Sequence, residues 1–396
     1  MDDVGAESTL PMLGASPLTS LRELAMLFLR LGTTAFGGPA AHIALMEDEV
    51  VRRRQWMTRE RFLDYVGATN LIPGPNSTEL AIHIGHARGG WPGLIVAGVC
   101  FIVPAMLIIT VVAWAYVRYG SLPDAAGLLY GIKPVVMSIV AMALWSLGRT
   151  AIKTVPLAIL GVVAVVLVAL GAHELAILAG AGAVMGIARF GRLSATRSRG
   201  LAIVAALGAS TAGAAAMQAS AGAVPFALQQ LFLVFVKAGA VLFGSGYVLL
   251  AFLRADLVER LRWLTEPQLL DAIAIGQVMP GPVFTTATFI GYVLAGPSGA
   301  IVATVGIFLP AFVFVAISGP IVPRLRQSVV AGAVLDGVNV ASLALMAVVS
   351  WHLGRAAFVD PWTVALGLAS LIALLQFRVN SAWLIALGAM FGWLVR

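Results

Sequence analysis

The chain contains one structural unit twice. Residues 36–75 align with residues 243–282 without a gap at a constant offset of 207, and twelve of the forty positions are identical. Chance would give about three identities at ordinary residue frequencies. After a shift of one residue the match continues as far as Arg149/Arg355. We therefore expect two homologous units, 22–189 and 227–396, with residues 1–21 as a tail and 190–226 as a linker.

Apolar runs fill both units. Crossing a hydrocarbon core of ~30 Å takes about 20 apolar residues. Hydrophobic residues make up 60% of the chain and charged residues only 11%, against roughly 45–50% and about 25% in soluble domains. The sequence predicts an all-α polytopic membrane protein. Thirteen candidate spans lie near 22–46, 62–87, 92–117, 126–148, 154–171, 173–189, 201–222, 227–252, 269–295, 298–322, 328–353, 361–377 and 380–395.

Each unit carries a Pro-Gly-Pro motif inside an apolar run, at 73–75 in the run 62–87 and at 280–282 in the run 269–295. Proline removes a backbone donor and clashes with the preceding turn, so each motif is expected to break a helix. Each run is then either one broken span or a re-entrant pair of half-helices that does not cross. Alternatively, the motif only kinks a helix that packs tightly on its neighbour.

The linker decides the relative orientation of the units. Its stretch 200–224 is apolar enough for one extra span, so with six spans per unit seven spans precede the second unit. An odd number inverts the second repeat, which is a common plan of secondary transporters. Fourteen Arg and Lys fall on the side of the N-terminus and eight on the other. The positive-inside rule then puts the tail 1–21 in the cytoplasm and the C-terminus outside, although the Arg cluster at 52–61 argues against it.

The backbone around the breaks is the first candidate binding site. A half-helix that starts after a break points its N–H groups and its positive dipole end into the bundle, which suits an anion. Flexible, close-packing glycine segments near the start of each unit form a second pair. These candidate residues are Pro73, Gly74, Pro75, Asn76, Pro280, Gly281, Pro282, Gly37, Gly38, Gly244, Ser245 and Gly246.

Three cations inside apolar runs are further candidates for the same site. Arg30 and Lys237 match each other at the offset of 207. A charge at the bilayer centre costs at least ~2.5–3.5 kcal/mol, so two matched cations favour a shared dianion. The alternatives are snorkelling to an interface or pairing with a carboxylate such as Glu23. Lys133 is the third cation, and its repeat partner is Asn339.

Titratable and polar residues near the breaks have weaker interpretations. Glu79, His83 and His86 share one helix face and could relay protons, although a structural role is favoured and no metal is expected. Asp64 and its match Asp271 are expected to be structural. Two helix starts are expected nearby, with Thr58 as a plain N-cap and Thr265 with Gln268 as a capping box.

Several classes of function lack support. The chain has one cysteine, Cys100, and so forms no intramolecular disulfide and no thiolate metal site. No Gly-rich phosphate loop suggests an ATP-driven pump. No convincing nucleophile–base pair suggests an enzyme, and no cofactor is expected. A membrane enzyme or scaffold remains the alternative to a carrier.

The same segments resemble the chromate ion transporter family, in its long, two-domain form. The resemblance rests on FGGPAAHIALMEDEVV, on RQWMTRERFLDYVGATNLIPGPNSTELAIHIGHARGGWPG and on LFGSGYVLLAFLRADLVERLRWLTEPQLLDAIAIGQVMPGPVFTTATFIGY. It implies a secondary carrier in the bacterial inner membrane that exports chromate from the cytoplasm, with sulfate or another anion as the rival substrate. The expected partners are chromate, its analogue sulfate and the lipid bilayer. A homodimer is an open alternative, and nucleic acid is not expected.

Overall fold

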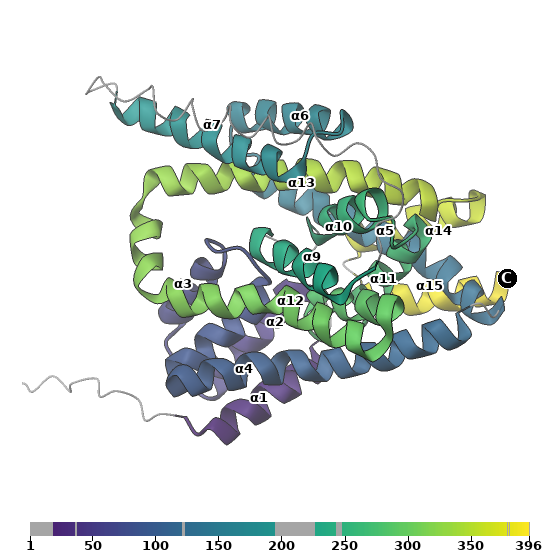
Figure 1. The fold of residues 1–396 in the computed structure, drawn as a ribbon, viewed down its shortest axis with the longest axis horizontal. Coiled ribbons are helices and arrows are strands. Elements are labelled where there is room, and N and C mark those ends of the chain that lie inside the picture. The colour runs from purple at the N-terminus through teal and green to yellow at the C-terminus, as the bar shows by residue number, and fades with distance from the viewer. Residues whose placement is uncertain are drawn as a thin grey trace, which may run out of the picture.

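A computed structural model describes residues 19–35, 38–120, 123–194, 226–242, 248–377, 379 and 381–395, which are helical and contain no strand (Figure 1). The first unit consists of α1 (Leu21–Thr34), α2 (Gly38–Glu47), the π-helical turn η1 (Asp48–Arg53), α3 (Arg59–Thr69), α4 (Asn76–Tyr119), α5 (Pro123–Ala151), α6 (Val155–Ala169) and α7 (Glu174–Ser194). The second unit consists of α9 (Leu228–Val241), α10 (Leu249–Leu253), η4 (Arg254–Arg260), α11 (Glu266–Val278), η5 (Val283–Thr285), α12 (Thr286–Gln327), α13 (Val329–Ala357), α14 (Pro361–Gln376) and α15 (Ser381–Val395).

The backbone confirms the internal repeat. Helix α4 breaks at Gly90, with φ 60° and ψ −149°, and α12 breaks at Gly296, with φ 62° and ψ −150°. Among the described residues, the non-glycine residues with positive φ are Gln55 and Arg262, which match at the offset of 207. The same local conformations therefore recur at the same places in both units. The predicted Thr58 cap and the capping box of Thr265 are also confirmed.

Helices α1 and α2 form a hairpin rather than one span. Helix α1 has 14 residues, which rise about 21 Å and cannot cross a core of ~30 Å. The chain then returns through α2 and η1 until Arg54 donates to Glu23, near the start of α1, at 2.7 Å. The prediction of a single span over 22–46 is therefore wrong. The length of an apolar run in the sequence does not show whether the chain reverses direction within it.

Helix α3 and the first arm of α4 form a second hairpin around the first Pro-Gly-Pro. After the motif the chain returns to Arg88, which donates to the Trp56 carbonyl oxygen at 3.1 Å and to Thr19 Oγ1 at 2.8 Å. Beyond Gly90 the second arm of α4 folds back along the first. Gly85 and Gly93 make this approach possible, because a Cβ on either would collide with the carbonyl oxygen of the other. The motif thus re-enters, and the long second arm is the part that crosses.

Long apolar helices follow the hairpins. Four helical stretches in the described part of the chain are long and apolar enough to cross a membrane, namely 76–119, 126–151, 283–318 and 330–357. Large apolar side chains on α4 and α12 are exposed, including Val111 at 63% and Ile317 at 54%. Exposed apolar side chains along such helices are suited to lipid. The described residues form a multi-pass membrane protein.

The long helices of the two units are antiparallel, and each unit packs its last two helices on a long helix of the other unit. In Figure 1 the long arm of α4 runs from left to right along the bottom, whereas α12 runs from right to left, and the two helices pack together. Helices α6 and α7 of the first unit lie on α13 of the second, while α14 and α15 lie on α5 of the first. This arrangement fits the expected inverted repeat. It also joins the halves through their long helices.

Candidate functional site

Each Pro-Gly-Pro turn docks on the opposite unit, and the two contacts are reciprocal. Gly74 N–H donates to the Leu242 carbonyl oxygen at 2.7 Å, and Gly281 N–H donates to the Ala35 carbonyl oxygen at 3.0 Å. Both pairs are related by the offset of 207. Ala35 and Leu242 are the C-caps of α1 and α9. Each turn is therefore bound to the tip of the first hairpin of the opposite unit.

Glycine is required at both turns. Gly74 has φ +140° and Gly281 has φ +91°, a region in which side chains are strained. A methyl group on Gly281 would collide with the methyl of Ala105 on α4, and one on Gly74 would lie 3.8 Å from Ala311 on α12. Each turn thus also rests against the long helix of the opposite unit. The hairpin tips thus form two pairs, each with one tip from either unit.

Helices begin directly after the turns. Helix α4 starts at Asn76, and η5 leads into α12 after Pro282. Neither Pro75 nor Pro282 provides a side-chain cap, while Asn76 Nδ2 donates to Asn70 Oδ1 at 2.8 Å. The positive ends of both helices therefore lie beside the docked turns, where a negative charge is favoured.

A buried carboxyl group lies against the first turn. Glu79, in the first turn of α4, is 0% exposed, and a methyl group on Gly74 would collide with its Oε1. Neither carboxyl oxygen has a hydrogen-bond partner among the described residues. His83, one helical turn further along α4, is 7% exposed, and its ring stacks on the Tyr65 ring with 5.4 Å between the ring centroids. His86 is exposed and contacts Trp91. The three predicted titratable residues thus extend from the buried turn towards the surface.

Arg30 and Lys237 each pair with a carboxylate of their own unit. Arg30 Nη2 lies 2.5 Å from Glu49 Oε1, and Lys237 Nζ lies 2.6 Å from Asp256 Oδ2. Glu49 and Asp256 match at the offset of 207, and each carboxylate also pairs with a second matched cation. These are Arg53 and Arg260. The cluster of Asp256 therefore has two cations for one carboxylate. In the cluster of Glu49, Arg53 also pairs with Asp48 and Arg54 with Glu23, so that three cations face three carboxylates.

Glu49 illustrates the charge balance of these clusters. Burial raises the pKa of its carboxyl, but hydrogen bonds and charge from Arg30, with Arg54 and Arg53, outweigh this and hold the pKa below its ordinary value. Arg30 thus pairs with a carboxylate, which was the alternative to binding an anion, although its partner is Glu49 rather than Glu23. Glu23 instead pairs with Arg54. The direct contact of Arg30 and Lys237 with an anion stays a prediction.

Lys133 links the two units. Its Nζ lies 2.8 Å from Asp271 Oδ1, and the Tyr116 hydroxyl donates to Asp271 Oδ2 at 2.8 Å. Lys133 and Tyr116 belong to the first unit, whereas Asp271 lies on α11 of the second. Asp271 therefore has the expected structural role, and substrate binding by Lys133 stays a prediction. Asp64, which matches Asp271 in the repeat, is exposed.

Some predicted residues cannot be placed. Gly37, Gly244, Ser245 and Gly246 lie outside the described residues, as does the extra span expected within 200–224. Gly38 begins α2 with φ +77°, and a Cβ there would meet no atom within 4 Å.

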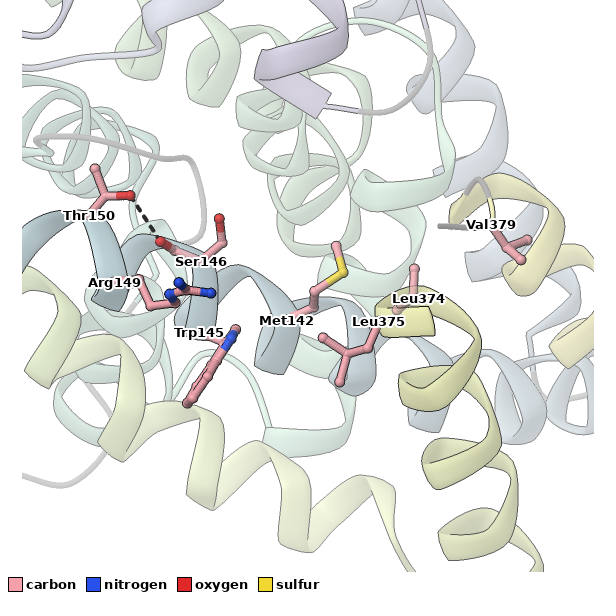
Figure 2. Close-up of a pocket in the computed structure, with 8 residues that line it drawn as sticks. All are labelled: Met142, Trp145, Ser146, Arg149, Thr150, Leu374, Leu375 and Val379. Atoms are coloured by element: carbon pink, nitrogen blue, oxygen red, sulfur yellow. Dashed lines mark hydrogen bonds between the residues drawn. The ribbon is translucent and has the colours of Figure 1, made fainter. Parts of the chain in front are cut away.

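Two cavities lie away from the turns. Figure 2 shows one of about 600 Å³, where Trp145 and Arg149 of α5 lie opposite Leu374 and Leu375 of α14. The other, of about 550 Å³, is lined by the repeat matches Trp351 and Arg355. Neither cavity is lined by a Pro-Gly-Pro residue or by a predicted anion contact.

Sequence reasoning missed the partners of the predicted residues. The carbonyl groups of Ala35 and Leu242 have no sequence signature, and His42, whose Nε2 lies 3.1 Å from the Ala35 carbonyl oxygen, has no repeat match. Glu49 and Asp256 could have been found, because the offset of 207 joins them as it joins Arg30 and Lys237.

Comparisons with known proteins follow the same division of the chain. The family model described as chromate transporter matches residues 22–187 and again residues 229–393. The chromate transport protein of Cupriavidus metallidurans is 33% identical over 94% of this chain and 92% of its own. A probable chromate transport protein of Synechococcus elongatus is 30% identical over 91% of this chain and 92% of its own.

The chromate transport protein of Pseudomonas aeruginosa is 30% identical over 96% of this chain and 93% of its own. No solved structure matches the chain. With one family model covering both units and relatives of this similarity along nearly the whole length, the chain belongs to the chromate transporter family.

Proposed function

We propose that this protein exports chromate from the cytoplasm across the bacterial inner membrane, and that the anion passes beside the docked Pro-Gly-Pro turns. The observation that carries this proposal is the reciprocal docking of Gly74 on Leu242 and of Gly281 on Ala35. It joins the two units through turns that each lead into a helix N-terminus. Binding between inverted repeats is the common plan of secondary transporters.

A tetrahedral dianion suits this site. Two positive helix ends supply partial charges and N–H donors. The cluster of Lys237 and Arg260 with Asp256 carries one cation more than carboxylates, which raises the local concentration of an anion. Sulfate has the same shape and charge as chromate and is the rival substrate. The relatives named as chromate transport proteins favour chromate.

Membrane potential alone can drive export of the dianion. Moving one charge through 100 mV is worth about 2.3 kcal/mol, so two negative charges gain about 4.6 kcal/mol on leaving a negative interior. That free energy corresponds to a concentration ratio on the order of a thousand or more. Proton antiport through Glu79, His83 and His86 is an additional option that this driving force does not require.

Flux measurements in liposomes test the proposal. Purified protein is reconstituted, the voltage is set with potassium and valinomycin without a pH gradient, and the fluxes of labelled chromate and sulfate are measured. Chromate should accumulate on the positive side and should do so faster at larger voltage. A chromate flux that does not depend on the sign or size of the voltage would contradict electrogenic export and favour electroneutral exchange. Faster flux of sulfate would instead favour the rival substrate.

Matched glycine variants test whether chromate transport depends on the Pro-Gly-Pro turns. Gly74→Leu and Gly281→Leu should abolish transport, because bulk blocks close approach of the backbone to the anion. Gly180→Leu is the control, since Gly180 lies on α7 and a Cβ there would meet no atom within 4 Å. Full transport by both turn variants would favour a role of the turns in packing alone.

A further inference from the structure

Glu79 differs from the other buried carboxyl groups of the described residues. These are Glu49, Asp256 and Asp271, and each has a Lys or Arg nitrogen within 2.8 Å. Glu79 is 0% exposed and has neither a cation nor a hydrogen-bond donor among the described residues. A buried carboxylate without a partner costs far more than a buried carboxylic acid.

Among the described residues, no Lys, Arg or His forms an ion pair with Glu79. Across from the turn, α12 presents Ala311, which does not titrate. On α4 itself His83 follows one turn later, and α3 contributes Tyr65, stacked on His83. Neither group lies within hydrogen-bond distance of the Glu79 carboxyl, whose oxygens have no partner. In the free protein the buried carboxyl is therefore favoured as the neutral acid.

We propose that the oxyanion binds only while Glu79 is protonated, so that proton and anion occupy the protein together. This inference rests on the proposed function, in which the anion binds at the N-terminus of α4. An ionised Glu79 and a dianion would compete for the same positive helix end, and their charges would repel each other. Binding of the anion therefore favours the protonated carboxyl. The proton comes from water and binds to Oε1 or Oε2, and no bond of the anion changes.

At the position that matches Glu79, the second unit carries a hydroxyl group instead of a carboxyl. Thr286 stands at the matching position, where its hydroxyl donates to the Val283 carbonyl oxygen at 2.8 Å. One proton is thus expected for each bound anion. The sign is opposite to antiport, because proton and anion move in the same direction. The net charge transferred per chromate falls from two to one, and transport remains electrogenic.

His83 and His86 give the proton a path. They follow Glu79 at i+4 and i+7, so successive groups are separated by about 6 Å and 4.5 Å along the helix axis. Exposure rises along this line, from the buried carboxyl to the exposed His86. A proton can therefore enter from the surface near Trp91 without passing the opposite unit.

The pH dependence of chromate binding tests the inference. Binding is measured by calorimetry on the full chain in nanodiscs from neutral to alkaline pH, for the wild type and for Glu79→Gln. An ionised Glu79 must take up a proton before the anion binds, so affinity should fall by up to about tenfold for each pH unit above the pH at which free Glu79 ionises. The variant should lose this dependence, and the difference between the two proteins excludes the titration of chromate itself. Exposed Glu60 supplies the control Glu60→Gln, which should behave as wild type.

A second variant protects the test against misfolding. Glu79→Thr places at this position the residue that the second unit already has, and it should lose the pH dependence in the same way. Equal pH dependence in the wild type and in either Glu79 variant would overturn the proton linkage while leaving chromate transport intact. If the wild type bound no chromate at any pH, the proposed function itself would be refuted.

Discussion

Replacing Gly281 by alanine tests whether the second Pro-Gly-Pro turn rests on α4. With φ at +91°, a non-glycine residue there costs about 1–3 kcal/mol in backbone strain. The new methyl would also collide with the methyl of Ala105, and the Gly32 carbonyl oxygen lies 3.1 Å away. Overpacking of this kind adds about 1–3 kcal/mol. The free energy of unfolding should fall by the sum of the two, about 2–6 kcal/mol.

A second substitution separates the two contributions. Ala105→Gly removes the obstructing methyl and should recover the overpacking part of the loss, about 1–3 kcal/mol. Alone it costs about 1 kcal/mol, because glycine weakens a helix interior. The strain at Gly281 remains in the double variant. The assay is unfolding in mixed micelles of dodecyl maltoside and SDS, applied to the wild type, both single variants and the double variant, which together give the coupling energy.

The equivalent pair in the other unit is the control. A methyl on Gly74 would lie 3.8 Å from the methyl of Ala311, which is an ordinary contact. Gly74→Ala and Ala311→Gly should therefore be additive. If the pair of Gly281 and Ala105 showed no more coupling than this control, the packing of the turn on α4 would be refuted.

Three further predictions concern charges and orientation. Arg30→Gln and Lys237→Gln should each weaken chromate binding by roughly 1.5–3 kcal/mol, because each removes a charge-assisted hydrogen bond; wild-type affinity of both in calorimetry would exclude them from the site. Asp271→Asn should lower the free energy of unfolding by about 3–5 kcal/mol by leaving Lys133 without its partner, and adding Lys133→Met should recover part of this loss; equal stability of the single and double variants would contradict the pair. Cysteines at positions 5 and 396, in a variant without Cys100, should react with an impermeant maleimide from opposite sides of the membrane, and labelling from one side would rule out an odd number of crossings.

The repeat made much of the architecture predictable. The offset of 207 that relates Gly74 to Gly281 also relates their docking partners Ala35 and Leu242. Residues that match in the sequence therefore make matching contacts in the structure. The helix breaks were predictable as well, because two prolines cannot continue a helix. The same offset indicated matched cations and would have indicated their matched carboxylates.

Direction and long-range pairing could not be predicted in this way. Hydropathy along 22–46 is the same for a span and for a hairpin, and the reversal depends on two short helices folding against each other. The pair of Lys133 and Asp271 joins different units, and no sequence pattern links them. The burial of Glu79 depends on its contact with Gly74, which only the turn geometry creates.

The reciprocal docking has a consequence for shorter chains of this kind. Each unit supplies the acceptor for the other's glycine, and α6 and α7 cover α13 of the opposite unit rather than a helix of their own. One unit alone would leave a glycine N–H and a hairpin-tip carbonyl unsatisfied inside the membrane, which is costly. A polypeptide with a single unit would therefore need a second polypeptide inserted with the opposite orientation, and both would have to be made in equal amounts. Fusing the two units into one chain guarantees that ratio.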